Sequence, residues 1–234
     1  MKWSALLLVW LVGCAPKAEG PPGTLRGVVK FSGIAGEAVV VDMDQDPQCS
    51  KLYPEGPREE QPVVVSPEGK LRNVFVYLKT GLEGKHFEAP KTPVRIDQKG
   101  CWFEPRVIGM QAGQGLQVTN SDPVTHNIHP QAQVNREWNQ SQAPEDGPLL
   151  RKFAKGEVMI RVKCNVHKWM RSWIGVVEHP FFAVTGADGS FSMQGVPPGQ
   201  YTLSAWHEKL GTREQVVSVS PGGQVSVELS FSGQ

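Results

Sequence analysis

The residues best suited to chemistry lie in two short stretches in the middle of the chain. One contains His126, and the other contains Cys164, His167 and Met170 in the spacing C-x2-H-x2-M. The second stretch follows a strand-like run at 158–162, so one tight loop can turn a thiolate, an imidazole and a thioether toward one point. A thiolate, two imidazoles and a weak thioether suit copper in both of its oxidation states. The sequence therefore predicts one copper ion, cycling between Cu(I) and Cu(II), on these four residues.

Other interpretations of the same residues remain open. Met170 can be a core residue, since thioethers fill irregular gaps, and Cys164 can be a buried structural thiol. A zinc ion on Cys164, His126 and His167 is a further alternative, although structural zinc prefers a fourth strong donor. His129 is three residues beyond His126, so on an extended strand it points to the opposite face, and we leave it out of the predicted site.

Other patterns that suggest chemistry lack residues that they need. Asp42, Asp44 and Asp46 alternate as in a calcium loop, but Pro47 stands where that turn requires glycine. The serines form no G-x-S-x-G elbow, so a hydrolase has no support. A two-copper centre of the oxidase type needs a second cysteine in the ligand loop, and only Cys164 is there. We therefore expect a carrier and not an enzyme.

Short β-strands must position these residues. Period-two alternation and β-branched runs recur from Leu25 to Phe231, for example at 26–31, 74–78 and 158–162. The 25 glycines and 19 prolines separate these runs as turns. We therefore predict an all-β fold, sandwich or barrel, divided into two small β-domains.

The predicted boundary between the domains is at His179-Pro180, because the region beyond it reads as a self-contained series of strands and turns. Residues 182–232 resemble the carboxypeptidase regulatory-like, prealbumin-like family through Asp188-Gly189-Ser190-Phe191 and Pro197-Pro198-Gly199-Gln200-Tyr201-Thr202-Leu203. This resemblance implies a small β-sandwich over 180–234 without catalytic residues. The stretch 27–41 also looks like the first strands of such a sandwich, so contact between the two ends of the chain is an open alternative.

Residues 70–178 resemble the cupredoxin family, through His126-Asn127 on one strand and a short, amicyanin-like ligand loop from Cys164 to Met170. The resemblance implies a type 1 blue-copper protein with a Greek-key β-barrel or sandwich, here over 25–179. The stretches 42–98 and 131–152 exceed a minimal member. We interpret them as insertions that cover the barrel or join it to the C-terminal sandwich.

The cupredoxin resemblance also assigns roles around the predicted metal. It implies that Asn127 ties the two ligand segments together by hydrogen bonds that tune the site. It implies that His167 is the ligand nearest to solvent. Trp169 and Trp173 would then lie in the surrounding surface, as a docking patch for a redox partner protein.

The start of the chain has the pattern of a lipoprotein signal. Lys2 is followed by an apolar run at 5–12 that ends in Leu11-Val12-Gly13-Cys14. The run is too short to span a bilayer, whereas cleavage before Cys14 and acylation of its thiol would leave a lipid-anchored protein. An ordinary signal peptide or a buried helix is the alternative. We predict a signal peptide at 1–13, a flexible tether at 14–24, and export to the cell membrane or outer membrane, facing the periplasm or exterior.

Export permits disulfides, and three of the four cysteines remain if Cys14 carries lipid. Cys49 and Cys101 each lie in a loop-like stretch beside proline or glycine, and neither has a metal-ligand neighbour at short spacing. We predict that they form a disulfide, which leaves Cys164 for the metal.

The balance of charge limits the partners. Removal of 1–13 takes Lys2 away and leaves 23 basic against 23 acidic residues, so nucleic acid has no electrostatic support. We expect electron transfer between the copper and a redox partner at the cell envelope. Two other functions would use the same residues: a copper-delivery lipoprotein, and a cell-surface binding module in which the metal is structural.

Overall fold

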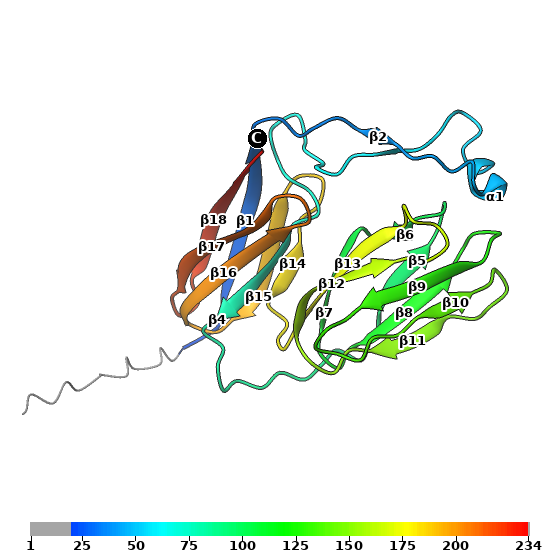
Figure 1. Cartoon of the computed structure of the whole chain (residues 1–234). Helices are drawn as coiled ribbons and strands as arrows, with labels where there is room; N and C mark the ends of the chain where they lie inside the picture. The colour runs from blue at the N-terminus through cyan, green and yellow to red at the C-terminus, as the bar shows by residue number, and fades with distance from the viewer. Residues whose placement is uncertain (1–19, 234) are drawn as a thin grey trace, which may run out of the picture.

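The computed structural model describes residues 20–233, and almost all of its regular structure is β-strand (Figure 1). In that range the helical structure is one turn, α1 (Pro47–Ser50), and nothing in it is long and apolar enough to cross a bilayer as a helix. The predicted all-β class is confirmed. The predicted signal peptide at 1–13 and Cys14 lie outside the described residues.

The central unit consists of two sheets that share one hydrophobic core. Its strands are β5 (Val94–Gln98), β6 (Phe103–Glu104), β7 (Val107–Gln111), β8 (Gly115–Asn120), β9 (His126–Gln131), β10 (Gln140–Gln142), β11 (Leu149–Lys152), β12 (Glu157–Lys163) and β13 (Arg171–Val177). One sheet has the order β10-β9-β12-β13-β7, and the other has the order β11-β8-β5-β6. Inward-facing residues of alternating strands, such as Ile96, Val118, Ile128 and Val162, fill the space between them.

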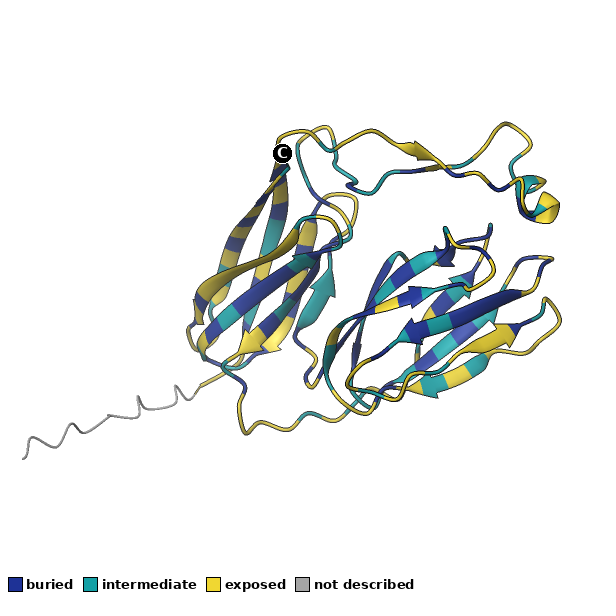
Figure 2. Ribbon diagram, viewed as in Figure 1, coloured by how far each residue is buried: buried dark blue, intermediate teal, exposed yellow. Residues whose placement is uncertain are grey.

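The terminal unit is a second sandwich, built from both ends of the described chain. Its strands are β1 (Gly23–Ser32), β4 (Phe75–Thr80), β14 (Phe182–Val184), β15 (Ser190–Val196), β16 (Gly199–His207), β17 (Gly211–Val219) and β18 (Gln224–Ser232). The sheets have the orders β15-β1-β18 and β14-β4-β16-β17. Buried residues, including Leu25, Leu78, Leu203 and Phe231, form its core (Figure 2).

The sheets do not follow the predicted boundary at His179-Pro180. β1 and β4, which we had placed in a first domain over 25–179, pair with strands of the terminal unit. β1 runs parallel to β18 from Thr24 to Ser32 and lies between β18 and β15, which would otherwise be left with unpaired inner edges. The contact between the two ends of the chain is therefore real. The predicted tether at 14–24 overlaps β1 at its last two residues, and 14–19 lie outside the described range.

Two glycines allow the units to approach closely. Gly109 on β7 and Gly175 on β13 are paired in register, and a Cβ on Gly175 would lie 2.5 Å from the ring of Phe75. A Cβ on Gly109 would lie 2.5 Å from the ring of Phe182. Two aromatic rings of the terminal unit therefore rest directly on the backbone of the central sheet.

Trp173 lies in this interface and not around His167, which corrects its predicted place in a docking patch. Its ring packs against Trp206 of the terminal unit at 5.0 Å between centroids. Its indole N–H donates to Glu208, which also forms an ion pair with Arg106 at 2.7 Å. β13 carries Trp173 away from the ligand loop and toward the terminal unit.

A long excursion leaves the terminal unit after β1, covers one end of the central unit and returns to the terminal unit at β4 (Figure 1). It passes out through β2 (Val39–Val40) and returns through β3 (Glu59–Glu60), which pair with each other. We call residues 41–60 the cover segment. Its Val41, Met43 and Cys49 are buried in the central core. The other predicted insertion, 131–152, contains β10 and β11 and completes the two central sheets.

Candidate metal centre

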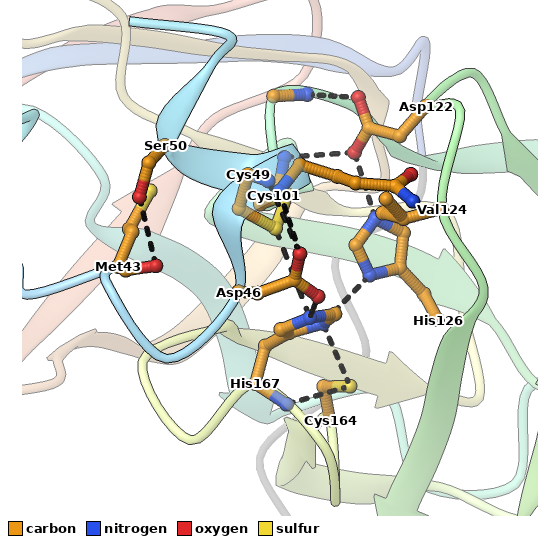
Figure 3. The surroundings of a disulfide bond; sticks show 12 residues. Met43, Asp46, Cys49, Ser50, Cys101, Asp122, Val124, His126, Cys164 and His167 are labelled. Carbon is orange, nitrogen blue, oxygen red and sulfur yellow. Dashed lines mark hydrogen bonds and ion pairs between the residues drawn. A yellow bond between two sulfur atoms is a disulfide. The ribbon is translucent and has the colours of Figure 1, made fainter.

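The three strongest predicted ligands converge at the covered end of the central unit (Figure 3). His126 begins β9, Cys164 follows the last residue of neighbouring β12, and His167 lies in the loop to β13. One potential donor atom of each lies within 4.8 Å of the others, and all three residues are buried. Pairing of β9 with β12 brings together residues that are far apart in the sequence.

The imidazoles present their Nδ1 atoms to the centre of the cluster. Nδ1 of His126 lies 2.9 Å from Nδ1 of His167, and Sγ of Cys164 lies 3.8 Å from the latter. Two ring nitrogens 2.9 Å apart are close enough to share a proton when no metal is bound. Such a proton is displaced when a metal ion binds to both nitrogens.

The outer nitrogens are held by two carboxylates. Nε2 of His126 is 2.8 Å from Asp122, and Nε2 of His167 is 2.8 Å from Asp46. An ionised carboxylate only accepts, so each Nε2 donates its proton and leaves Nδ1 to face the cluster. Histidines that bind metals commonly donate their other N–H in this way.

The sequence did not identify either carboxylate as part of the site. Asp46 entered only as a member of a rejected calcium pattern. Asp46-Pro47 is a helix-start signal, and Asp46 does cap α1 by accepting from the backbone N–H of Gln48 and Cys49. That signal places a cap but says nothing of which side chain lies above it. Asp122 had no such signal.

The groups of the cluster favour charged forms. Burial raises the pKa of Cys164, but hydrogen bonds from His126 and His167 outweigh it and lower the pKa to about 6. Burial lowers the pKa of both histidines, but their bonds to Cys164 and to the two aspartates outweigh it, so the pKa of each is raised. The thiolate is the form of Cys164 that binds a metal, and a histidine that carries a second proton must release it to bind through Nδ1.

Backbone bonds set the shape of the ligand loop. The N–H of His167 donates to Sγ of Cys164 at 3.3 Å, and the N–H of Cys164 donates to the carbonyl of Met170 at 3.2 Å. Met170 is fully buried in the same core cluster as Cys164. The loop thereby brings Met170, the residue before β13, back beside Cys164.

Asn127 makes the contact that the resemblance implied. Its Oδ1 accepts from the backbone N–H of Asn165 at 3.0 Å, which ties β9 to the ligand loop, and its amide donates to Asn139. The loop is therefore held both by its own hydrogen bonds and by the strand that carries His126.

The predicted Cys49–Cys101 disulfide is formed, and it lies beside the site. Sγ of Cys49 is 3.7 Å from Nε2 of His167. Trp169 covers another side, with its ring centroid 5.2 Å from that of His167 and its N–H bonded to the carbonyl of Cys101. The side chain of His167 is only 2% exposed, and Cys164, His126 and Met170 are 2%, 0% and 0% exposed, so the four predicted ligands are almost equally enclosed. The cover segment, which minimal relatives lack in our interpretation, lies against His167 through Asp46 and Cys49.

The remaining histidines lie apart from the cluster. His129 contacts Asn165 and Glu137 and does not face the other ligands. His86 is exposed, and His179 and His207 are buried in the terminal unit or at its edge.

The residues present fit a copper ion. One thiolate and two imidazole Nδ1 atoms converge, and the fourth predicted donor, Met170, is a thioether buried at the end of the same loop. Zinc in a structural site would require a further strong donor. Asp46 and Asp122 do not supply it, because both are already bonded to the outer nitrogens.

Comparisons with known proteins give partial similarities. Residues 157–227 match the family model described as polysaccharide lyase family 4, domain II, a stretch that runs from β12 into β18. No curated protein matches the sequence.

Solved structures include similar copper proteins. The copper-containing nitrite reductase of Thermus scotoductus SA-01 is 20% identical, with a TM-score of 0.35, over 42% of this chain and 25% of that one. A purple cupredoxin from Nitrosopumilus maritimus is 18% identical, with a TM-score of 0.30, over 35% of this chain and 97% of that one. A mutant of amicyanin in its oxidised state is 21% identical, with a TM-score of 0.31, over 36% of this chain and 81% of that one. These likenesses are partial, so the function is inferred from the donor atoms of the site.

Proposed function

We propose that this chain is a mononuclear copper protein of the type 1 kind that carries single electrons and catalyses no reaction itself. The observation that supports it is the buried convergence of Cys164 Sγ with the Nδ1 atoms of His126 and His167. Copper bound to this donor set accepts and releases one electron.

The arrangement of the protein favours electron transfer over ligand exchange. The ligands come from two paired strands and a loop closed by its own hydrogen bonds, so they keep their positions when the charge at the centre changes. A site with little rearrangement suits transfer of an electron.

Burial distinguishes the proposal from copper delivery. The side chains of His126 and His167 are 0% and 2% exposed, and Cys164 is 2% exposed. A delivery protein must present its ligands to an acceptor protein, whereas an electron can cross a covering layer of protein. An electron carrier therefore retains Cu(I) against a chelator that strips a delivery protein.

The lipobox pattern places this function at the cell envelope in our proposal, with lipid on Cys14 and a redox protein as partner. Expression of the full chain and of Cys14→Ser, with a labelled fatty acid, tests the anchor. Label that persists in Cys14→Ser would contradict it.

The copper site is tested by visible absorption and electron paramagnetic resonance of the protein loaded with Cu(II). We expect an intense thiolate-to-copper band that is lost in Cys164→Ser. His129→Gln is the matched control, because His129 lies on the same strand as His126 but outside the cluster. That variant should retain the band. Absence of the band from the unchanged protein, or preferential binding of zinc at equal supply, would contradict the proposal.

A further inference from the structure

A carboxylate chain links the disulfide to His167 on the side away from the thiolate (Figure 3). Asp46 accepts from Nε2 of His167 at 2.8 Å with one oxygen. With its other oxygen it accepts from the backbone N–H of Gln48 at 2.9 Å and of Cys49 at 3.4 Å. The carboxylate that holds His167 is thus itself held by the residue that forms the disulfide.

A second chain of the same kind links the disulfide to His126. Asp122 accepts from Nε2 of His126 at 2.8 Å, and the same oxygen accepts from the backbone N–H of Cys101 at 2.7 Å. Its other oxygen accepts from the N–H of Gly100 at 2.6 Å. The side chain of Asp122 is 4% exposed, so water does not compete for these bonds.

We propose that the Cys49–Cys101 disulfide joins Asp46 and Asp122 into one positioning element that orients both ligand histidines from their outer nitrogens. The proposal rests on the proposed metal site. It adds Asp46, Asp122 and the disulfide, which are not part of the predicted ligand set. It also predicts that the state of the disulfide governs the orientation of the ligands.

The disulfide is the covalent link between the turn that carries Asp46 and the loop of Gly100 and Cys101, and it acts beside the buried side chain of Met43 and the Tyr53 hydroxyl, which donates to the carbonyl of Gly100 at 2.6 Å. α1 is a single turn, too short to be stable by its own hydrogen bonds. The far end of the cover segment is fastened separately, where Glu60 forms ion pairs with Arg106 and Arg171. Between these points the covalent bond of Cys49 to Cys101 fixes the turn that carries Asp46.

The experiment reads the histidine Nε2 protons of the purified full-length chain by NMR with 15N-labelled histidine, without added copper. In the unchanged protein, His126 and His167 should each show a slowly exchanging Nε2 proton bonded to a carboxylate. His179 supplies an internal control, because its Nε2 donates to the carbonyl of Leu78, far from the disulfide.

Three variants separate the parts of the element. Asp46→Asn should shift the signal of His167, and Asp122→Asn should shift that of His126. The double variant Cys49→Ser/Cys101→Ser should raise the exchange rate of both protons by at least about tenfold. The His179 proton should be unchanged in all three.

Unchanged His126 and His167 protons in a folded double variant would overturn the proposal. If that variant loses the His179 signal as well, and so is unfolded, the intact disulfide is reduced with a phosphine under native conditions and the same protons are followed. Retention of both would equally overturn it. Because copper is absent, failure here is distinct from failure to form a thiolate-to-copper band.

A second readout uses copper. In the double variant loaded with Cu(II), we expect a shifted thiolate-to-copper band, whereas a purely structural role would leave the band in place and lower only the stability. An unshifted band together with unchanged ring protons would assign the disulfide to stability alone.

Discussion

The two units hold their buried histidines in opposite ways. In the central unit, His126 and His167 each bond a carboxylate and lie beside a thiolate, and their pKa values are raised although burial alone would lower them. Among the described residues, no carboxylate is bonded to the ring of His179 or of His207, and burial lowers the pKa of both, that of His207 to about 4. Among residues 20–233, these four are the buried histidines.

The difference shows that a buried histidine is suited to bind a metal when a carboxylate and a thiolate lie beside it. Burial alone does not distinguish the two pairs. Both ring nitrogens of His179 are used by the backbone, since Nε2 donates to Leu78 and Nδ1 accepts from the N–H of Phe181. Nδ1 of His207 accepts from the N–H of Lys209. Neutral histidines of this kind fasten the ends of strands. The central pair instead keeps both Nδ1 atoms turned toward a thiolate.

The largest expected effect comes from exchanging one buried histidine for glutamine in each unit. Zinc bound by four ligands in zinc-finger peptides contributes about 10–16 kcal/mol, and by this measure the loss of one of four copper ligands should cost roughly 3–4 kcal/mol, or about a few hundredfold to a thousandfold in affinity. We expect this loss for His126→Gln, measured by competition with a chromophoric copper chelator. His207→Gln should leave the affinity unchanged. Equal losses of copper affinity in His126→Gln and His207→Gln would show that the two kinds of buried histidine do not differ in metal binding.

A smaller effect concerns stability against pH in the terminal unit. The pKa of His207 is about 4 in the folded chain and about 6.5 when unfolded, so the unfolded state binds more protons between these values. The contribution of His207 to stability is complete above about pH 6.5 and is lost as pH falls toward 4, by about 2–3 kcal/mol. His179 acts in the same direction.

Urea unfolding at several pH values checks this expectation. His207→Gln should flatten the dependence between about pH 6.5 and 4. An identical slope in wild type and His207→Gln would show that His207 does not titrate in this way.

The smallest effect is expected from the side chain of Asn127, which bonds the loop, because the backbone bond of Asn127 to Cys164 is kept when the side chain is truncated. Asn127→Ala removes the bond to the N–H of Asn165 and should weaken copper binding by about 10-fold. Asn135→Ala is the matched control, since Asn135 bonds Glu157 and Lys155 away from the site. A loss as large as that of His126→Gln would make Asn127 a ligand-like residue and would require the site to be redrawn.

Much of the site follows from local sequence. The C-x2-H-x2-M spacing lies within one loop, so chain geometry alone brings Cys164, His167 and Met170 close together. The odd number of cysteines left after Cys14 pointed to the Cys49–Cys101 pair, which the structure contains. Alternation of apolar residues was enough to predict strands throughout.

The partners of the ligands could not be predicted in this way. Asp46 lies 121 residues from His167, and its contact depends on where the cover segment crosses the central unit. Asp122 is only four residues from His126, yet the turn between them decides whether they meet. The enclosure of His167 could not be predicted for the same reason, because the resemblance described a shorter fold without this cover.

The sequence by itself determined the strand content, the donor types and the loop that presents them, because each depends on neighbours within a few residues. Only the tertiary structure decided that β1 and β4 join the terminal unit and that His167 is enclosed. The physical reason is that the free energies of strand pairing and burial depend on contacts between segments that are far apart in the sequence. No short stretch of sequence shows which distant strand will pair with it, or which distant carboxylate will bond its histidine.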